Sequence, residues 1–265
     1  SAFGKLPPEI LARLLAQNGM KVGLNDVNPK LLEQTMAEFS AAGLTALALP
    51  ADVSALYPAT AAEVNAMVAR AEAELGPLWL LVNNAGVFNA GPTVDLPEAA
   101  WDQAFAVDAK GVFLCSQAAL RVMLPRRQGR IVNIASIAGQ IVRTGQIAYC
   151  SAKAAVIHFT RCLAVEVASQ GITVNCLCPG MTWTEMLQTS AAERGLKLRA
   201  AIAQPACRNL DQHQRRERAN GGRALMGRLI QKSDFPDAFA RSQSVQHGAA
   251  AGDRDLGRRV VGLAA

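Results

Sequence analysis

The segment from Leu78 to Gly86 reads LWLLVNNAG, a continuous apolar run followed by small and polar residues. A strand without polar alternation is buried on both faces, as in a parallel sheet that helices cover on either side. Helical patterns of more than ten residues flank this run at 60–75 and 101–124. The segment therefore predicts an α/β fold in which residues 78–82 form a buried strand.

The same alternation of apolar strands and helices extends along most of the chain. It builds βαβ units, whose functional sites lie at the carboxyl ends of the strands. No strand is expected before the first helix, and after about Arg194 the alternation fades into an Arg-, Gln- and Ala-rich stretch. We expect helices at 9–17, 29–42, 60–75, 101–124 and 149–169, and strands at 21–25, 44–49, 78–82, 130–135 and 172–177.

Composition indicates one globular protein. The 265 residues are 51% hydrophobic and 18% charged, enough for a substantial core and unlike a disordered chain. No apolar run reaches the roughly 20 residues of a membrane span and no leader is seen, so we expect a cytoplasmic protein. The six cysteines form no C-x-x-C pair and the three histidines are scattered. We therefore expect reduced thiols and no metal site.

Basic side chains concentrate near the end of the chain. Residues 1–193 hold 13 of the 27 lysines and arginines but 15 of the 21 acidic residues, a net charge of −2, so the basic excess belongs to residues 194–265, with +8. Nucleic-acid binding through this segment is a minor alternative, because the segment lacks interleaved aromatic residues and a recognisable module. We expect no nucleic-acid partner.

A serine, a tyrosine and a lysine form the strongest functional pattern. Tyr149 follows Ser136 by thirteen residues, and Lys153 follows Tyr149 by four. Helical residues four apart share one face, so the phenol and the ammonium lie one turn apart. A phenol has a pKa of about 10, and an adjacent cation favours the phenolate. The pattern indicates proton transfer on an alcohol or carbonyl; a helix-surface pair and a turn serine are the alternatives.

At these residues the chain resembles the short-chain dehydrogenase/reductase (SDR) family, over roughly residues 10–190. The markers are Asn83–Gly86, Ser136, Tyr149–Lys153 and Pro179–Gly180 with Thr184 following. The resemblance implies a Rossmann-like, doubly wound parallel sheet. It also implies reversible hydride transfer between a nicotinamide cofactor and an alcohol or carbonyl substrate.

The resemblance also assigns roles to residues. Tyr149 would be the general acid/base, Ser136 would orient and polarise the substrate oxygen, and Lys153 would lower the tyrosine pKa and bind the nicotinamide ribose. Asp26 ends a strand, where a carboxylate can bond both ribose hydroxyls and repel a 2′-phosphate, which favours NAD over NADP. Ordinary turn residues are the alternative at the cofactor positions, which are Asp26, Asp52, Val53, Asn83, Ala85, Gly86, Tyr149, Lys153, Pro179, Gly180 and Thr184.

The fourth catalytic position of the family is an asparagine, and here it is Asp108. In the family its main-chain carbonyl holds a water of the proton relay, so that function can persist. A carboxylate near Lys153 would stabilise the ammonium and offset part of its pull on Tyr149. We therefore expect slower turnover and a more alkaline pH optimum than an asparagine would give.

The family begins with a strand and a Thr-Gly-x-x-x-Gly-x-Gly loop, whose amides face the pyrophosphate. Residues 1–8 contain Gly4 but not the expected glycines, so this strand and loop are expected to be missing or degraded. Buried ladder groups beside residues 78–82 would then need another partner. Weak dinucleotide binding would follow.

Two domains are expected: a dinucleotide-binding and catalytic SDR domain at 1–193, and an atypical basic segment at 194–265. The second would contain the substrate lid and a divergent or out-of-frame tail. Codon degeneracy permits the codons of Gly252–Leu263, read in a frame shifted by one base, to encode GIATLGGGWSV. That alternative sequence resembles the C-terminal end of family members. A native but divergent basic tail is the alternative.

The sequence leaves the substrate open among 3-oxoacyl thioesters, sugars, steroids and small ketones. Residues 87–96, 137–148 and 185–210 are expected to line an apolar pocket. The resemblance implies a homodimer or homotetramer. The leading hypothesis is an NAD-dependent alcohol dehydrogenase or ketone reductase, and the alternative is a catalytically compromised relative that keeps the fold and binds dinucleotide weakly.

Overall fold

The computed structural model describes residues 8–54, 60–180 and 260–264. The chain divides into two compact units, Ser1–Leu196 with Asp255–Ala265, and Lys197–Arg254. All of the described residues belong to the first unit. Its α-helices are α1 (Pro8–Gln17), α2 (Pro29–Ala41), α3 (Thr60–Leu75), α4 (Glu98–Phe105), α5 (Val112–Met123) and α6 (Ile147–Val167). Its strands are β1 (Lys21–Asn25), β2 (Ala46–Ala48), β3 (Leu78–Asn83), β4 (Gly129–Ile134), β5 (Ile172–Leu177) and β6 (Val260–Ala264).

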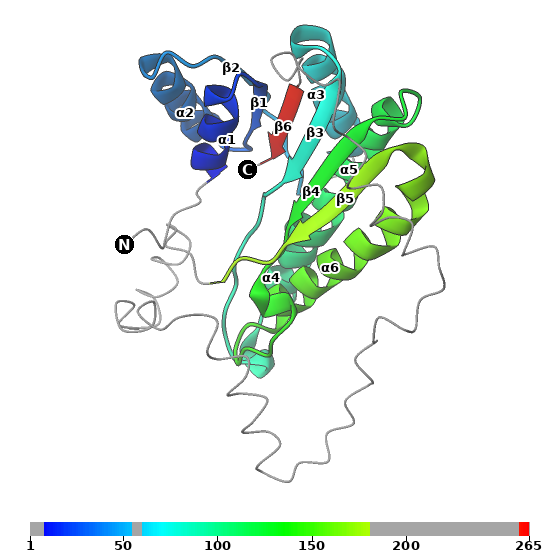
Figure 1. The fold of residues 1–265 in the computed structure, drawn as a ribbon. Coiled ribbons are helices and arrows are strands. Elements are labelled where there is room, and N and C mark those ends of the chain that lie inside the picture. The colour runs from blue at the N-terminus through cyan, green and yellow to red at the C-terminus, as the bar shows by residue number, and fades with distance from the viewer. Residues whose placement is uncertain (1–7, 55–59, 181–259, 265) are drawn as a thin grey trace. The chain divides into compact units, whose positions relative to one another are not determined.

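The strands form one parallel sheet in the order β2-β1-β6-β3-β4-β5 (Figure 1). Leu81 of β3 lies opposite Ile131 of β4, and Ile131 lies opposite Val174 of β5. Because all strands run the same way, their carboxyl ends gather at one edge of the sheet. The α/β fold with a parallel sheet that the sequence predicted is confirmed.

A strand from the end of the chain lies inside the sheet. β6 pairs with β1 on one side and β3 on the other, so that Gly262 lies opposite both Gly23 and Leu81 (Figure 1). The inner ladders of β1 and β3 would otherwise be buried without partners. The slot beside residues 78–82 that the sequence left without a partner is therefore filled by residues 260–264.

Helices cover the two faces of the sheet with separate cores. Val22, Leu24 and Val82 pack with Ala12 of α1 and Phe39 of α2 on one face. On the other face, α3, α5 and α6 cover β3, β4 and β5 with a larger cluster. The largest buried members of that cluster are Met123 and Ile131. This three-layer arrangement is the one that continuous apolar strands predict.

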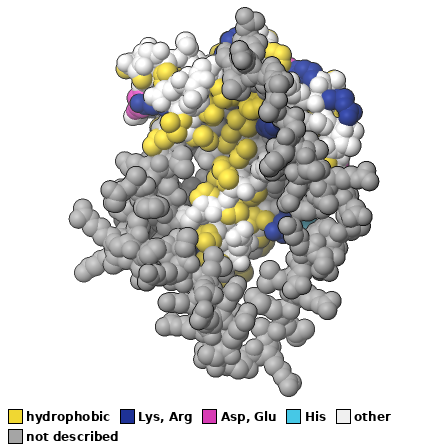
Figure 2. Space-filling view, in the orientation of Figure 1, with side chains coloured by type: hydrophobic (Ala, Val, Ile, Leu, Met, Phe, Trp, Pro, Cys, Tyr) yellow, Lys and Arg dark blue, Asp and Glu magenta, His cyan; other side chains and the backbone are white. Residues whose placement is uncertain are grey.

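The face that carries α1 and α2 is less completely covered at β4 and β5. The side chains of Val132 and Ile134 are half-buried there, and Leu177 is exposed. Figure 2 shows hydrophobic side chains in a band down one side of the molecule. Within the described part of the chain, no helix is long and apolar enough to cross a membrane.

Most of the expected elements are confirmed. The expected bounds of β1, α3 and β5 are those observed, and those of α1, α2, β4 and α6 differ by one or two residues. The single helix expected at 101–124 is wrong, because a π-helical segment, Ala106–Gly111, separates α4 from α5. At its end the backbone passes Val53 so closely that a Cβ on Gly111 would lie 2.6 Å from the Val53 carbonyl oxygen. This tertiary contact accounts for glycine at that position.

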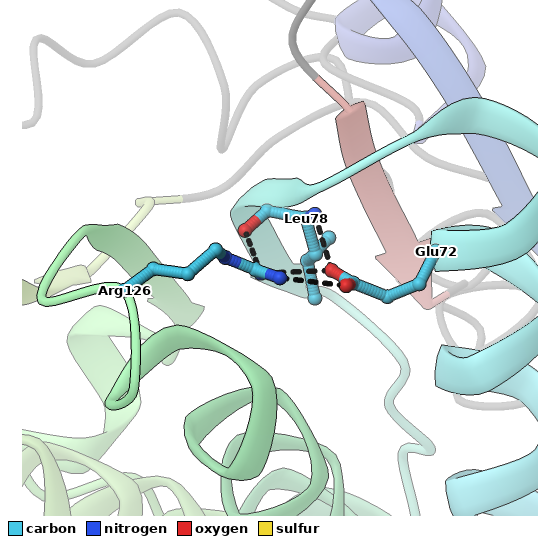
Figure 3. Close-up of polar contacts among 3 residues, drawn as sticks. All are labelled: Glu72, Leu78 and Arg126. Atoms are coloured by element: carbon cyan, nitrogen blue, oxygen red, sulfur yellow. Dashed lines mark hydrogen bonds and ion pairs between the residues drawn. The ribbon is translucent and has the colours of Figure 1, made fainter.

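An ion pair closes the edge of the sheet opposite the carboxyl ends. Both terminal nitrogens of Arg126 bind the carboxylate of Glu72, at 2.7 and 2.8 Å (Figure 3). The same carboxylate accepts the backbone N–H of Leu78, and Arg126 also reaches the Leu78 carbonyl. A bidentate pair of this kind fixes direction as well as distance. It holds the end of α3, the start of β3 and the turn after α5 together.

The central position of β6 leads to a stability prediction. Gly262→Pro removes an N–H from a strand with neighbours on both sides, so we expect a loss of at least about 3 kcal/mol in unfolding free energy. Gly262→Ala keeps that N–H and is the control. Thermal unfolding and hydrogen exchange of the β1 and β3 amides measure the effect. Unchanged stability and exchange in the proline variant would show that β6 does not complete the sheet.

Candidate active site

The predicted catalytic serine lies directly beyond β4. Ser136 is the N-cap of a short 3₁₀ turn, Ile137–Gly139, and its Oγ accepts the N–H of Ala138 at 3.1 Å. The backbone N–H of Ile137 donates to the Pro179 carbonyl at 3.0 Å. The loop after β5 is thereby tied to the loop that carries the serine. This places Ser136 at the carboxyl edge of the sheet, as predicted.

Tyr149 and Lys153 lie on the first turns of α6 and point to the same side. The Lys153 Nζ lies 5.7 Å from the centroid of the Tyr149 ring. Ser136 lies close enough to Tyr149 to lower the pKa of its phenol, and the rings of Phe88 and Tyr149 meet edge to face at 5.0 Å between centroids. The one-turn geometry that the spacing predicted is therefore present.

The ammonium of Lys153 is almost fully buried and has two oxygen neighbours. Its Nζ donates to the carbonyl of Ile134 at 3.2 Å and lies 3.6 Å from Oδ1 of Asp108. Glycines allow this approach: a Cβ on Gly86 would lie 2.9 Å from that Oδ1 and 3.2 Å from Nζ. A Cβ on Gly139 would lie 2.7 Å from the Lys153 carbonyl carbon. Small residues here thus serve the packing of the catalytic pair.

Asp108 lies in the π-helical segment with no exposed surface. Its Oδ1 accepts the backbone N–H of Val87 at 2.9 Å, whereas its Oδ2 has no hydrogen-bond partner among the described residues. Burial raises the pKa of this carboxyl from 3.8 to about 6, against the lowering effects of Lys153 and of the Val87 amide. Asp108 therefore has a pKa of about 6, and its Oδ1 faces the ammonium of Lys153.

The electrostatics of Tyr149 differ from the expectation. The resemblance implied that Lys153 lowers the tyrosine pKa, but burial raises the pKa of Tyr149 above 10. The bond to Ser136 lowers it, and the charge of Asp108 raises it further. The ammonium of Lys153 contacts Asp108 and the Ile134 carbonyl, so its lowering effect on the pKa of Tyr149 is offset. This supports the prediction that an aspartate at position 108 offsets part of the effect of Lys153 on the pKa of Tyr149.

A buried network of side-chain hydrogen bonds connects the elements that carry the site residues. Asn83 donates to Ser116 at 3.1 Å and to Asn133 at 2.8 Å, and Asn133 donates to Thr160 at 2.9 Å. These hydrogen bonds connect β3, α5, β4 and α6. Of these residues the sequence pointed only to Asn83, although an asparagine in the middle of the apolar strand RIVNI was a visible signal for Asn133. A buried hydrogen-bond network of this kind fixes the relative positions of the elements that it connects.

The other predicted cofactor positions lie at the same edge of the sheet. Asp26 follows β1, and its Oδ1 accepts the N–H of Asn28, the residue that caps α2. Asp52 accepts the N–H of Ser54 at 2.7 Å, and Val53 is buried in the core. Ala85 and Gly86 follow β3, and Pro179 and Gly180 follow β5. Thr184 lies outside the described residues, and within them no cluster of three metal-binding side chains occurs.

The pKa of Asp108 predicts how pH affects stability. Between pH 4 and 6 the folded protein keeps a proton on Asp108 that the unfolded chain has lost, so raising pH destabilises the fold. Asp108→Asn cannot titrate. We therefore expect the Tm of the wild type, relative to that of Asp108→Asn, to fall as pH rises from about 4 to about 6 and then to level off. A constant difference across this range in thermal scans would contradict the assignment.

Known proteins are similar to this chain in sequence and in fold. The short chain dehydrogenase family matches residues 9–195. The 2,3-dihydro-2,3-dihydroxybenzoate dehydrogenase of Bacillus subtilis is 39% identical over 178 residues, which are 67% of this chain and 66% of that protein. The inactive 2-(S)-hydroxypropyl-CoM dehydrogenase 2 of Xanthobacter autotrophicus is 42% identical over 170 residues, 64% of this chain and 70% of that protein.

A solved structure of another dehydrogenase is similar to this chain in fold. The gluconate 5-dehydrogenase of Burkholderia cenocepacia, in complex with NADP and tartrate, superposes with a TM-score of 0.62 at 32% identity, covering 68% of each chain. The match to the Bacillus subtilis dehydrogenase spans slightly less than two thirds of that relative's own length. Fold, site geometry and family match agree: the chain belongs to the short-chain dehydrogenase family.

Proposed function

We propose that this protein is an oxidoreductase that moves a hydride between a nicotinamide dinucleotide and an alcohol or carbonyl substrate. One observation carries the proposal. Ser136 and the phenol of Tyr149 lie close together beside the buried ammonium of Lys153, at the carboxyl edge of a parallel sheet. Two hydroxyls that converge in this way can bind one substrate oxygen between them.

Each of these residues has a distinct part in the chemistry. Tyr149 gives a proton to the carbonyl oxygen in reduction and takes it back in oxidation. Ser136 donates to the same oxygen and stabilises the developing charge. Lys153 holds positive charge beside the phenol, and Asp108 sets how much of that charge the phenol experiences. When bound, the nicotinamide supplies or accepts the hydride.

The described residues fit a dinucleotide at its ribose ends. Asn25 and Asn83 end β1 and β3, and each has a buried side-chain oxygen without a hydrogen-bond partner in the described residues. Such oxygens suit hydroxyl donors. Asp26 and Asp52 add carboxylates at this edge, and Lys153 would hold the nicotinamide ribose. The described residues include no glycine-rich loop for the pyrophosphate, whose expected place at residues 1–7 lies outside them.

The position of the family's first strand is part of this proposal. β6 occupies the position between β1 and β3 where the resemblance places that strand. We infer that residues 260–264 take its structural role in the sheet.

Asp26 supports NAD as the preferred cofactor. Among the described residues only one of its oxygens is engaged, by the N–H of Asn28, so the other can accept from a ribose hydroxyl and would repel a 2′-phosphate. The similar gluconate 5-dehydrogenase structure contains NADP, so NADP is at least an equal candidate. Parallel titrations with NADH and NADPH decide between the two.

The substrate class and assembly extend the proposal. Names among the similar proteins include a dihydroxybenzoate dehydrogenase and a gluconate dehydrogenase. We propose a 3-oxoacyl, sugar or simple ketone substrate for this chain, of which the gluconate dehydrogenase supports the sugar class. We further propose a cytoplasmic homodimer or homotetramer, with a catalytic domain at 1–193 and a basic segment at 194–265 that carries the substrate lid and a divergent or out-of-frame tail.

A second candidate is a catalytically compromised family member. The buried carboxylate of Asp108 opposes the phenolate of Tyr149, and one similar relative is named as inactive. In that case the fold persists, dinucleotide binds weakly and no carbonyl compound is reduced. NADH binding followed by fluorescence separates this candidate from the first.

The central test is Tyr149→Phe in a panel of sugar, acyl-thioester and simple ketones assayed with NADH and NADPH. We expect a loss of at least about 100-fold in kcat, because the phenol is the proton donor. Tyr57→Phe, which changes the only other tyrosine, is the matched control and should retain activity. Equal turnover by Tyr149→Phe and wild type would refute the proposed mechanism, and weak NADH binding without any turnover would favour the second candidate.

A further inference from the structure

An aromatic ring from the loop after β3 lies against the proposed proton donor. The ring centroids of Phe88 and Tyr149 are 5.0 Å apart, and the ring planes are inclined at 69°. In this edge-to-face arrangement aromatic pairs attract one another beyond the gain from burying their surfaces. Both side chains are half-buried. Phe88 therefore contacts the tyrosine from a segment of the chain that carries none of the other proposed catalytic side chains.

Asp108 anchors the residue that precedes Phe88. Its Oδ1 accepts the backbone N–H of Val87 at 2.9 Å and lies 3.6 Å from Nζ of Lys153. The backbone comes this close because residue 86 is glycine: a Cβ on Gly86 would lie 2.9 Å from the same Oδ1. The carboxylate that faces the ammonium thus also fixes the backbone next to the phenylalanine ring.

The loop is anchored on the other side of Phe88 as well. The side-chain amide of Asn89 donates to the carbonyl of Ala100 in α4 at 3.1 Å. The backbone N–H of Gly91 donates at 2.9 Å to the carbonyl of Gly145, which lies two residues before α6 begins. These bonds join the loop to α4 and to the segment that leads into α6. The ring is therefore held from both sides against the first turn of that helix.

The contact bears on the chemistry, because the phenol has to point at the substrate oxygen. A helix fixes the backbone of a tyrosine but leaves its ring free to turn about two side-chain bonds. Burial is the largest influence on the phenol of Tyr149, whose pKa it raises, and Phe88 covers part of that ring. The same contact thus restricts both the direction of the ring and the access of water to it.

We propose that Phe88 is a positioning residue for Tyr149, which fixes the orientation of the phenol and shields part of its ring from water. The inference rests on the proposed function, because it concerns the proton that Tyr149 would exchange with the substrate. Phe88 itself transfers no proton. The sequence pointed to residues 87–96 only as part of an apolar pocket, and the contact with the tyrosine ring gives Phe88 a more specific role.

The pKa of Tyr149 tests the inference without a substrate, by absorbance of the full-length protein with Tyr57→Phe as background. Phe88→Ala should lower this pKa, because water then reaches the phenolate and stabilises it. Phe88→Leu keeps a branched apolar side chain and should show a smaller change of the same sign. Phe113→Ala is the matched control and should leave the pKa unchanged, since Phe113 meets the ring of Phe159 edge to face.

Kinetics with a ketone that the wild type reduces give a second readout. Phe88→Ala should lower kcat by at least about 10-fold with little change in KM, because the proton donor is misplaced while the substrate still binds. Phe88→Leu should recover part of this loss, and Phe113→Ala should retain the kcat of the wild type. Thermal unfolding establishes that each variant is folded, and Phe88→Leu carries the test if Phe88→Ala is not.

The outcomes separate this inference from the proposed function. If the wild type reduces no ketone, the proposed function fails, and the pKa of Tyr149 alone decides the inference. The inference is overturned if substitution of Phe88 leaves that pKa unchanged, or if Phe113→Ala lowers it equally. A lower pKa with an unchanged kcat also overturns it, because the phenol would then keep its orientation without the ring.

Discussion

The buried ammonium of Lys153 is the interaction on which the site depends. A charge without exposed surface needs oxygen partners, because an unpaired buried ion is strongly destabilising. Lys153 finds them in the carbonyl of Ile134 and the carboxylate of Asp108. Those contacts join α6 to β4 and to the π-helical segment, and the carboxylate in turn accepts from the loop after β3. One side chain thereby fixes the relative positions of every segment that carries a proposed catalytic group.

The pair of Lys153 and Asp108 also limits how far the pKa of Tyr149 is lowered. An ionised Asp108 stabilises the ammonium and opposes the phenolate, and burial of Tyr149 acts in the same direction. A π-helical turn places this carboxylate there; such turns occur often at functional sites. In the proposed reaction, proton transfer by Tyr149 would therefore be coupled to the protonation of Asp108. An asparagine at that position would provide the Val87 contact without the charge.

Local patterns account for what the sequence predicted well. The apolar runs of β1 and β5 and the helix from Thr60 to Leu75 gave the observed bounds, because flanking turn residues mark them. The catalytic spacing of Tyr149 and Lys153 translated directly into a shared helix face. Tertiary features could not be predicted from the sequence. The π-helical segment ends where Gly111 approaches the backbone of Val53. β6 pairs with strands that are far from it in the sequence. The raised pKa of Tyr149 follows from burial, which spacing does not reveal.

The most direct test of this account is the pKa of the Tyr149 phenol. With Tyr57→Phe as background, Tyr149 is the only tyrosine, and its ionisation can be followed by absorbance or by ¹³C NMR. The account predicts a pKa above 10 in the cofactor-free protein and a lower value when Asp108→Asn is added, since burial and Asp108 both raise it. A pKa below 10 that Asp108→Asn does not change would contradict the proposed coupling.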